Sequence, residues 1–377
     1  MKWSEIDKTT ASVIAATSLI TFGYLVYRLR QPARLNTDQS KANISFASQQ
    51  LVFLAPVKFK TAIAPANAII FVHPPKVGGT NLTFVADALS KADPDFKAIR
   101  FAVPRVPGQS PGKIYTNWTG GLKAAQTKLK TEPDCCKDMN FVSGHFPFGA
   151  HKMLGLQAKY VVLVRNPVER EISNTNFDFQ RGYLTRDQAK EYLLNANIDN
   201  PQTRMLAGVD YMSGVCTTDV LETAKRNIEQ HFLLAGITED TNTFIQVLAS
   251  IQDWGPLALT RSQVTGDKVF TKIDPEFQQL LAHKHSFDMQ LYAWVKNRWL
   301  EWKQQNIDTT APIEPLSKKA LCILPEYAHD RTPIFMNLIE IANYNQKVRG
   351  GLIQVSQNHI GLKSEDRTIA AYTSKPS

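Results

Sequence analysis

The chain has 377 residues, 43% of them apolar and 20% charged, a composition that excludes a disordered chain and a multi-span membrane protein. Lysine and arginine outnumber aspartate and glutamate by 43 to 34, a formal net charge of +9, which favours anionic partners such as nucleotides or acidic glycans. Nucleic acid is not an expected partner, because the chain has no basic block and no basic stripe interleaved with aromatic residues. The four cysteines form no CxxC pair, so they indicate no structural zinc site and their pairing stays open.

The amino-terminal segment contains an uncharged apolar run over residues 11–27. This length is just enough to span a bilayer as a helix. Basic residues follow at once and no small-residue cleavage site ends the run, so residues 1–30 are predicted to form a retained membrane anchor with its flanks rather than a signal peptide. Hydroxyl side chains within the run leave a buried or amphipathic helix as the alternative. Residues 31–65, which contain several prolines, are expected to form a stem.

Strand and helix patterns alternate over residues 66–303. Apolar, β-branched runs predict buried strands at residues 68–73, 97–103, 140–143, 159–164 and 232–237. Helical spacing of apolar residues predicts helices at residues 81–89, 186–195, 217–230, 239–252 and 275–303. This alternation predicts an α/β domain with a parallel sheet flanked by helices. Residues 304–377 show no clear pattern and are expected to form a carboxy-terminal extension.

The turn after the first predicted strand has the composition of an anion-binding loop. Gly78 and Gly79 allow the backbone to bend so that successive N–H groups converge on an anion, and the helix that follows adds the positive end of its dipole. Lys76 contributes a full charge and Thr80 a hydroxyl donor. The lysine precedes the glycines, so the loop is P-loop-like without being the GxxxxGK[ST] motif.

Here the sequence resembles a known family. The segment His73-Pro-Pro-Lys-Val-Gly-Gly-Thr-Asn-Leu82 is similar to the donor loop of membrane-associated carbohydrate sulfotransferases, especially the group that contains heparan sulfate 2-O-sulfotransferase. In that family the loop binds the 5′-phosphosulfate of 3′-phosphoadenosine-5′-phosphosulfate. The resemblance implies that Lys76 contacts the bridging oxygen and the sulfuryl group. The implied donor ligands are Pro75, Lys76, Val77, Gly78, Gly79, Thr80 and Asn81.

A second segment, Arg165 to Ser173, follows the strongest predicted strand and resembles the family's 3′-phosphate element. The planar guanidinium of arginine suits phosphate, and the resemblance implies Arg165 and Ser173 as ligands. Asn166 stands where the family more usually has aspartate, which removes no ligand. Arg170 is expected to make structural ion pairs.

His145 follows the predicted strand at 140–143 and resembles the histidine that the family uses as catalytic base. Its ordinary pKa lies near neutrality, which suits removal of a proton from an acceptor hydroxyl; His151 is the runner-up. The segment from Asn200 to Gly208 also resembles the family, and Arg204 there is predicted either to contact an acidic acceptor or to brace the site. His285 to Tyr292 resembles the family's final helix, with His285 in place of asparagine.

The resemblance implies a sulfotransferase that uses this donor, needs no metal and acts on a hydroxyl, expected on an acidic glycan. A tyrosine side chain, a glycolipid or a small alcohol stays open as acceptor. The alternatives are a kinase-like nucleotide-dependent phosphotransferase and a catalytically silent glycan- or anion-binding membrane protein. The implied location is the Golgi membrane with a lumenal domain, or a bacterial inner membrane. Charges around the predicted span do not decide its orientation. Glycan sequons occur at Asn43, Asn81 and Asn117.

Overall fold

The computed structural model describes residues 50–101, 120–195, 198–209, 214–260, 268–271, 273–310, 320–323, 334–336 and 354–358. All the described residues belong to one compact unit, which lies within residues 47–377. The predicted anchor, the first part of the stem and the sequons at Asn43 and Asn117 lie outside the described residues. Within the described part of the chain, no helix is long and apolar enough to cross a membrane. The four cysteines are free thiols.

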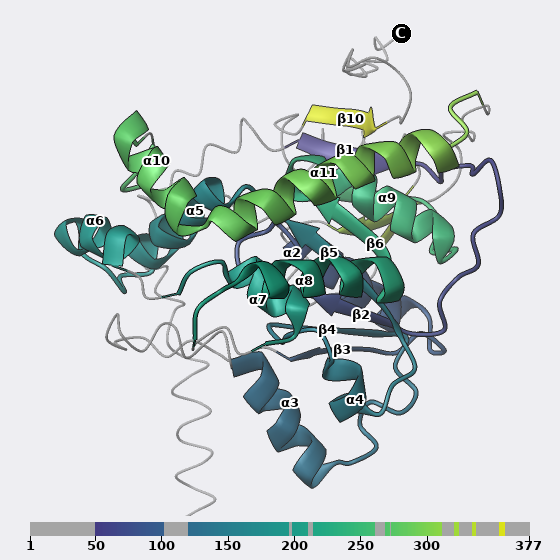
Figure 1. Ribbon diagram of the computed structural model, residues 1–377. Coiled ribbons are helices and arrows are strands. Elements are labelled where there is room, and N and C mark those ends of the chain that lie inside the picture. Colours follow the sequence, from purple (N-terminus) through teal and green to yellow (C-terminus); the bar gives the residue numbers. More distant parts are fainter. Residues whose placement is uncertain are drawn as a thin grey trace, which may run out of the picture. The chain divides into compact units, whose positions relative to one another are not determined.

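A parallel sheet forms the centre of the unit (Figure 1). It consists of β2 (Ile69–Val72), β3 (Ala98–Phe101), β4 (Phe141–Gly144), β5 (Lys159–Val164) and β6 (Phe232–Ile237), in the order β3-β4-β2-β5-β6. Three of these strands, β2, β4 and β5, are almost completely buried. This burial explains the continuous apolar sequences of β2 and of residues 160–164 in β5, because helices cover both faces of such a sheet. The predicted parallel sheet flanked by helices is confirmed.

Helices connect the strands and pack against them. They are α2 (Thr80–Ala92), α3 (Gly120–Thr131), α4 (Ala150–Leu154), α5 (Pro167–Gln180), α6 (Arg186–Asn195), α7 (Pro201–Ala207), α8 (Thr218–His231), α9 (Thr241–Ile251), α10 (Pro275–Lys284) and α11 (Ser286–Asn306), with a 3₁₀ turn, η5, at Thr238–Asp240. Helices α2 and α3 pack against β3, whereas α8, α9 and α11 pack against β6. The helix predicted over 275–303 is divided at His285 into α10 and α11.

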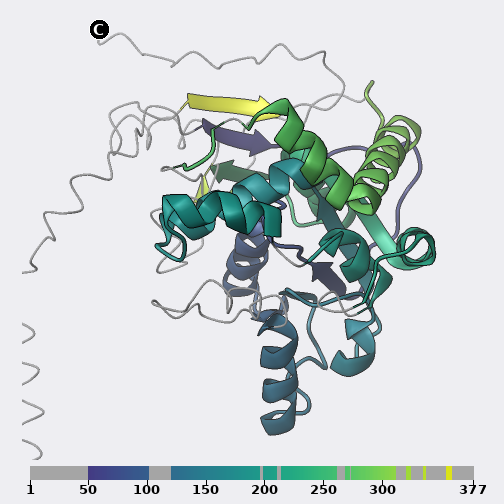
Figure 2. The same ribbon diagram turned by 60° about the vertical axis from the view of Figure 1, so that its left-hand side comes forward.

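A second sheet lies beside the first and was not predicted. It consists of β1 (Gln50–Leu54), β7 (Leu257–Thr260), β8 (Ala320–Ile323), β9 (Ile334–Met336) and β10 (Gln354–Asn358), in the order β10-β1-β7-β8-β9. Strand β1 pairs in parallel with β10, which lies next to it in Figure 2. The expected stem therefore ends inside this folded unit, and the expected extension contributes three of the strands. Local sequence patterns do not predict this sheet, because the strands that pair in it are far apart in the sequence.

The strand order places a change of direction beside β2. From β2 the chain moves outward to β3, returns to β4, and crosses to β5 and β6 on the other side of β2. The loops that leave the carboxyl ends of the neighbouring strands β2 and β5 therefore run in opposite directions. Ligands of open α/β sheets bind in the crevice at such a point. The predicted donor loop follows β2, and Arg165 follows β5.

Candidate functional site

The loop after β2 has the backbone shape of an anion cradle. Lys76 has φ of +69° and Gly78 has φ of +82°, whereas Val77 between them does not have a positive φ. Such alternation turns successive N–H groups toward one concavity. A lysine with positive φ is uncommon, and strained residues of this kind gather at functional sites. Helix α2 begins directly after the loop, with no acidic residue in its first turn and no side-chain cap at Gly79.

Neighbouring side chains hold this loop in shape. A Cβ atom at Gly79 would lie 2.4 Å from Cζ of Phe71 and 2.9 Å from Cδ2 of His73, so only glycine fits there. From the end of β6, the hydroxyl of Thr238 lies 2.7 Å from the carbonyl oxygen of Val77. The contacts of Phe71, His73 and Thr238 therefore fix the backbone of the loop without a ligand, so an anion would meet N–H groups that are already oriented.

Lys76 links the two predicted phosphate elements. Its half-buried side chain places Nζ 4.0 Å from the centroid of the Phe177 ring on α5, a cation–π contact. Its carbonyl oxygen accepts a hydrogen bond of 3.1 Å from Nη1 of Arg165. The arginine implied for the 3′-phosphate and the lysine implied for the 5′-phosphosulfate therefore lie in direct contact.

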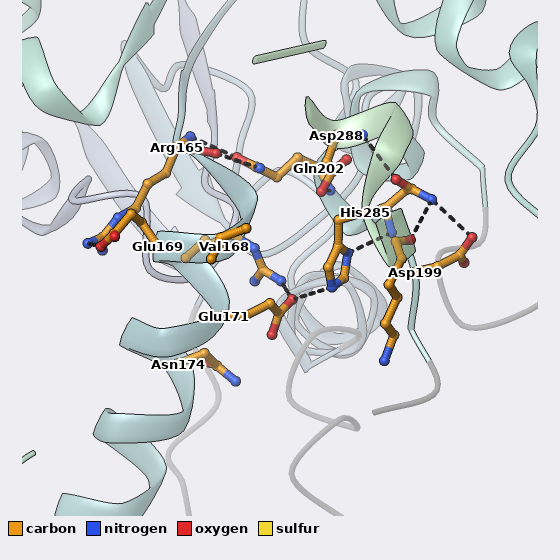
Figure 3. Close-up of polar contacts among 12 residues, drawn as sticks. Arg165, Val168, Glu169, Glu171, Asn174, Asp199, Gln202, His285 and Asp288 are labelled. Carbon is orange, nitrogen blue, oxygen red and sulfur yellow. Dashed lines mark hydrogen bonds and ion pairs between the residues drawn. The ribbon is translucent and has the colours of Figure 1, made fainter. Parts of the chain in front are cut away.

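The backbone of Arg165 is held by the side-chain amide of Gln202 (Figure 3). The Arg165 N–H donates to Oε1 of Gln202 at 2.9 Å, and Nε2 of Gln202 donates to the Arg165 carbonyl, also at 2.9 Å. Next along the chain, Oδ1 of Asn166 accepts hydrogen bonds from the N–H groups of Val168 and Glu169 and caps α5. Asparagine therefore performs a capping role here that an aspartate at the same position could also fill.

Helices α7 and α11 cap each other beside this arginine. The carboxylate of Asp288, in the first turn of α11, accepts hydrogen bonds from the backbone N–H groups of Gln202 and Thr203 and from the Thr203 hydroxyl. In return, Oδ1 of Asn200 accepts hydrogen bonds from the N–H groups of Phe287 and Asp288. Each helix start thus satisfies its N–H groups with a side chain of the other helix.

His285 extends this buried network to α5. Its Nδ1 accepts a hydrogen bond of 3.2 Å from the Asn200 N–H, and its Nε2 lies 3.5 Å from Oε1 of Glu171 (Figure 3). Glu171 is also paired with Arg170, which is 1% exposed. The expected structural ion pair of Arg170 is confirmed. Burial, assisted by the charges of Arg170 and Lys284, lowers the pKa of His285 to about 3 and keeps it neutral.

His145 lies at the carboxyl end of β4, next to the donor loop. Its Nδ1 is 2.5 Å from the carbonyl oxygen of His73. Because a carbonyl can only accept, Nδ1 carries the hydrogen and the neutral ring has its lone pair on Nε2, the form required of a base. Burial, followed by the charge of His145, lowers the pKa of His73 well below its ordinary value.

His151, the alternative candidate for the base, lies on α4, where its Nδ1 is 2.8 Å from the Tyr160 hydroxyl.

The remaining predicted residues differ in their placement. Within the donor loop and the start of α2, Pro75, Val77 and Gly79 are buried, Thr80 and Asn81 are half-buried, and Gly78 is exposed.

Ser173 is half-buried on α5, and its predicted contact with a 3′-phosphate stays a prediction. Arg204 is 3% exposed and pairs with Asp199 and with the carbonyl of Gly214. Burial takes its guanidinium away from solvent, so the structure favours the bracing alternative over contact with an acceptor.

Sequence reasoning assigned no role to Gln202, Asp288, Phe177 or Thr238. The segments 200–208 and 285–292 did carry a signal, since both resemble the family, but the resemblance did not indicate that they meet. Phe177 and Thr238 have no motif of their own.

No protein-family model and no curated protein matches this chain. Among solved structures, a sulfotransferase from Alicyclobacillus acidocaldarius is similar, with 16% sequence identity and a TM-score of 0.32. The match covers 63% of this chain and 100% of that chain. At this TM-score the similarity carries no argument, so a functional conclusion depends on the residues of the site.

Proposed function

We propose that this protein is a sulfotransferase that transfers a sulfuryl group from 3′-phosphoadenosine-5′-phosphosulfate to an acceptor hydroxyl. The observation that carries the proposal is the hydrogen bond between the Arg165 guanidinium and the Lys76 carbonyl. This bond brings the loop of Lys76 next to the segment of Arg165. The sequence relates the first to the 5′-phosphosulfate and the second to the 3′-phosphate of the same donor. Both follow the carboxyl ends of neighbouring parallel strands, where nucleotides bind in open α/β sheets.

The residues of the donor loop suit the 5′-phosphosulfate. A Cβ atom at Gly79 would clash within the protein, and the positive φ of Lys76 and Gly78 turns N–H groups toward one point. When bound, the donor supplies a sulfuryl group whose bond to the phosphate oxygen breaks as its bond to the acceptor oxygen forms. Lys76 and the loop N–H groups stabilise the negative charge that develops on the leaving oxygen.

His145 suits the acceptor side. With a hydrogen on Nδ1 held by the His73 carbonyl, Nε2 accepts the proton of the acceptor hydroxyl as the oxygen attacks sulfur. Arg165 binds the 3′-phosphate with its guanidinium, and the nucleotide product is adenosine 3′,5′-bisphosphate. The proposed reaction therefore uses one base, His145, one anion cradle, the loop after β2, and two cations, Lys76 and Arg165.

We propose a carbohydrate acceptor, preferably an acidic one, because the formal charge of +9 favours anionic partners. The predicted anchor at residues 11–27 supports action at a membrane, in the Golgi lumen or at a bacterial inner membrane. Radiolabelled donor incubated with a panel of glycans, peptides and lipids would identify the acceptor.

Lys76→Ala tests the reaction itself. We expect a loss of turnover of about 100-fold or more, because a charge that stabilises the transition state is removed, while the fold stays intact. Lys225→Ala is the matched control, since Lys225 lies on α8 in an ion pair with Glu222. Turnover of the labelled donor is the measurement. Unchanged turnover in Lys76→Ala would contradict the proposed function.

A further inference from the structure

Gln202 occupies an unusual position between the candidate nucleotide site and the interior. Its side chain is 1% exposed. The amide bonds to both backbone polar groups of Arg165, which follows the last paired residue of β5. Buried backbone groups beyond the end of a strand need partners from elsewhere. One side chain thus supplies both partners and fixes the peptide groups on either side of Arg165.

Gln202 is itself fixed from behind. Its own backbone N–H donates to Oδ2 of Asp288 at 3.1 Å, and the N–H of the next residue, Thr203, donates to Oδ1 at 2.7 Å. Asp288 is completely buried. A continuous chain of hydrogen bonds therefore runs from α11 through Gln202 to the backbone of Arg165. The contact between Gln202 and the Arg165 backbone is visible in Figure 3, and the Arg165 guanidinium donates to the Lys76 carbonyl of the donor loop.

We propose that Gln202 is a positioning residue for the 3′-phosphate, acting through Arg165. The inference rests on the proposed function and deepens it. A fixed backbone limits the directions that the arginine side chain can take, so less freedom is lost when the guanidinium binds phosphate. Without Gln202 the backbone groups of Arg165 lose their partners, and the loop after β5 can move away from the donor loop.

A purely structural role for Gln202 gives a different result from a positioning role. Loss of general stability would weaken every nucleotide alike. Loss of positioning at Arg165 would weaken only ligands that carry a 3′-phosphate. Adenosine 3′,5′-bisphosphate and adenosine 5′-phosphosulfate separate these two cases, because the second has no 3′-phosphate.

The test is Gln202→Met in the full chain, with calorimetric affinities for both nucleotides. Methionine has a similar volume and removes both hydrogen bonds. We expect the bisphosphate to bind about 10-fold more weakly, the scale of one lost interaction, and the phosphosulfate to bind as before. Arg165→Ala should show the same selective loss. Adding Gln202→Met to Arg165→Ala should have no further effect, because residues that act through one another are not additive.

Gln246→Met is the matched control. Gln246 is 3% exposed, and its amide donates to the Ala55 carbonyl at 2.6 Å, so the chemical change is the same at a different place in the fold. We expect this variant to keep both affinities. Should Gln202→Met fold poorly, Gln202→Glu keeps an acceptor for the Arg165 N–H and loses the donor, and it should show the same selectivity.

The possible outcomes separate the two proposals. If both Gln202 variants bind the bisphosphate as the wild type does while Arg165→Ala does not, the positioning role is wrong and the proposed function stands. Equal losses for both nucleotides would also overturn positioning. If the wild type binds neither nucleotide, the proposed function itself fails.

Discussion

His285 should make the protein sensitive to acid. The neutral ring accepts a hydrogen bond from the Asn200 N–H through Nδ1, at 3.2 Å, and is completely buried. Protonation would place a hydrogen on Nδ1 facing that N–H and would bury a charge near Arg170 and Lys284. Burial, followed by the charges of Arg170 and Lys284, lowers the pKa of His285 to about 3 in the folded protein, against about 6.5 in an unfolded chain.

The direction and size of the effect follow from proton linkage. Between these two pKa values the unfolded chain binds more protons, so the stability contributed by neutral His285 is present above pH 6.5 and is lost as pH falls toward 3. For these values, the loss between pH 7 and pH 5 is about 2 kcal/mol. Burial raises the pKa of Asp288, which acts in the opposite direction.

A comparison of the wild type with His285→Asn isolates the histidine, since Asp288 is present in both. Asparagine does not titrate, and its amide oxygen can accept the Asn200 N–H. Urea unfolding at pH 7 and pH 5 measures the free energy of unfolding. We expect the wild type to lose about 2 kcal/mol more than the variant over this interval. Equal losses in the two proteins would refute the reasoning.

Two further predictions concern the loops of the site. Gly79→Ala should destabilise the protein by about 1–3 kcal/mol, because the added methyl would lie 2.4 Å from the ring of Phe71; denaturant unfolding measures this, and a loss below about 0.5 kcal/mol would contradict the packing described. Asn166→Ala should cost about 1 kcal/mol by removing the cap of α5, whereas Asn166→Asp should keep it. Thermal unfolding distinguishes the two, and equal losses would show that the cap contributes nothing.

The central sheet could be predicted because its strands are locally distinctive. After its exposed first residue, strand β5 (Lys159–Val164) is buried on both faces, so residues 160–164 are apolar and rich in valine. The second sheet carries no such signal. Gln50 pairs with Gln354, and Leu257 with Leu321, so these short strands depend on partners that local patterns cannot identify. The break at His285 was missed because α11 begins at Ser286, directly after the cap of α10, with no glycine or proline between the two helices.

The candidate site carries a sequence signal where charged residues follow a strand. Lys76 stands beside the glycines of the loop after β2, and Arg165 follows β5 directly before the start of α5, and both side chains suit anions wherever they are placed. Gln202 has no such intrinsic chemistry, since a buried amide gains its role only from the groups it meets. Its contact with Arg165 depends on the placement of α7 beside the residue that follows β5, which sequence patterns do not supply.

The mutual capping of α7 and α11 has a consequence for synthesis. The Asp288 carboxylate that accepts the Gln202 N–H lies 86 positions later in the chain. At about 5–20 residues per second, the ribosome needs roughly 4–17 s to supply it. During that time the start of α7 lacks its acceptors, and the amide of Gln202 has no fixed position from which to hold Arg165. The backbone of Arg165 in the candidate site is therefore secured only when the start of α11 emerges.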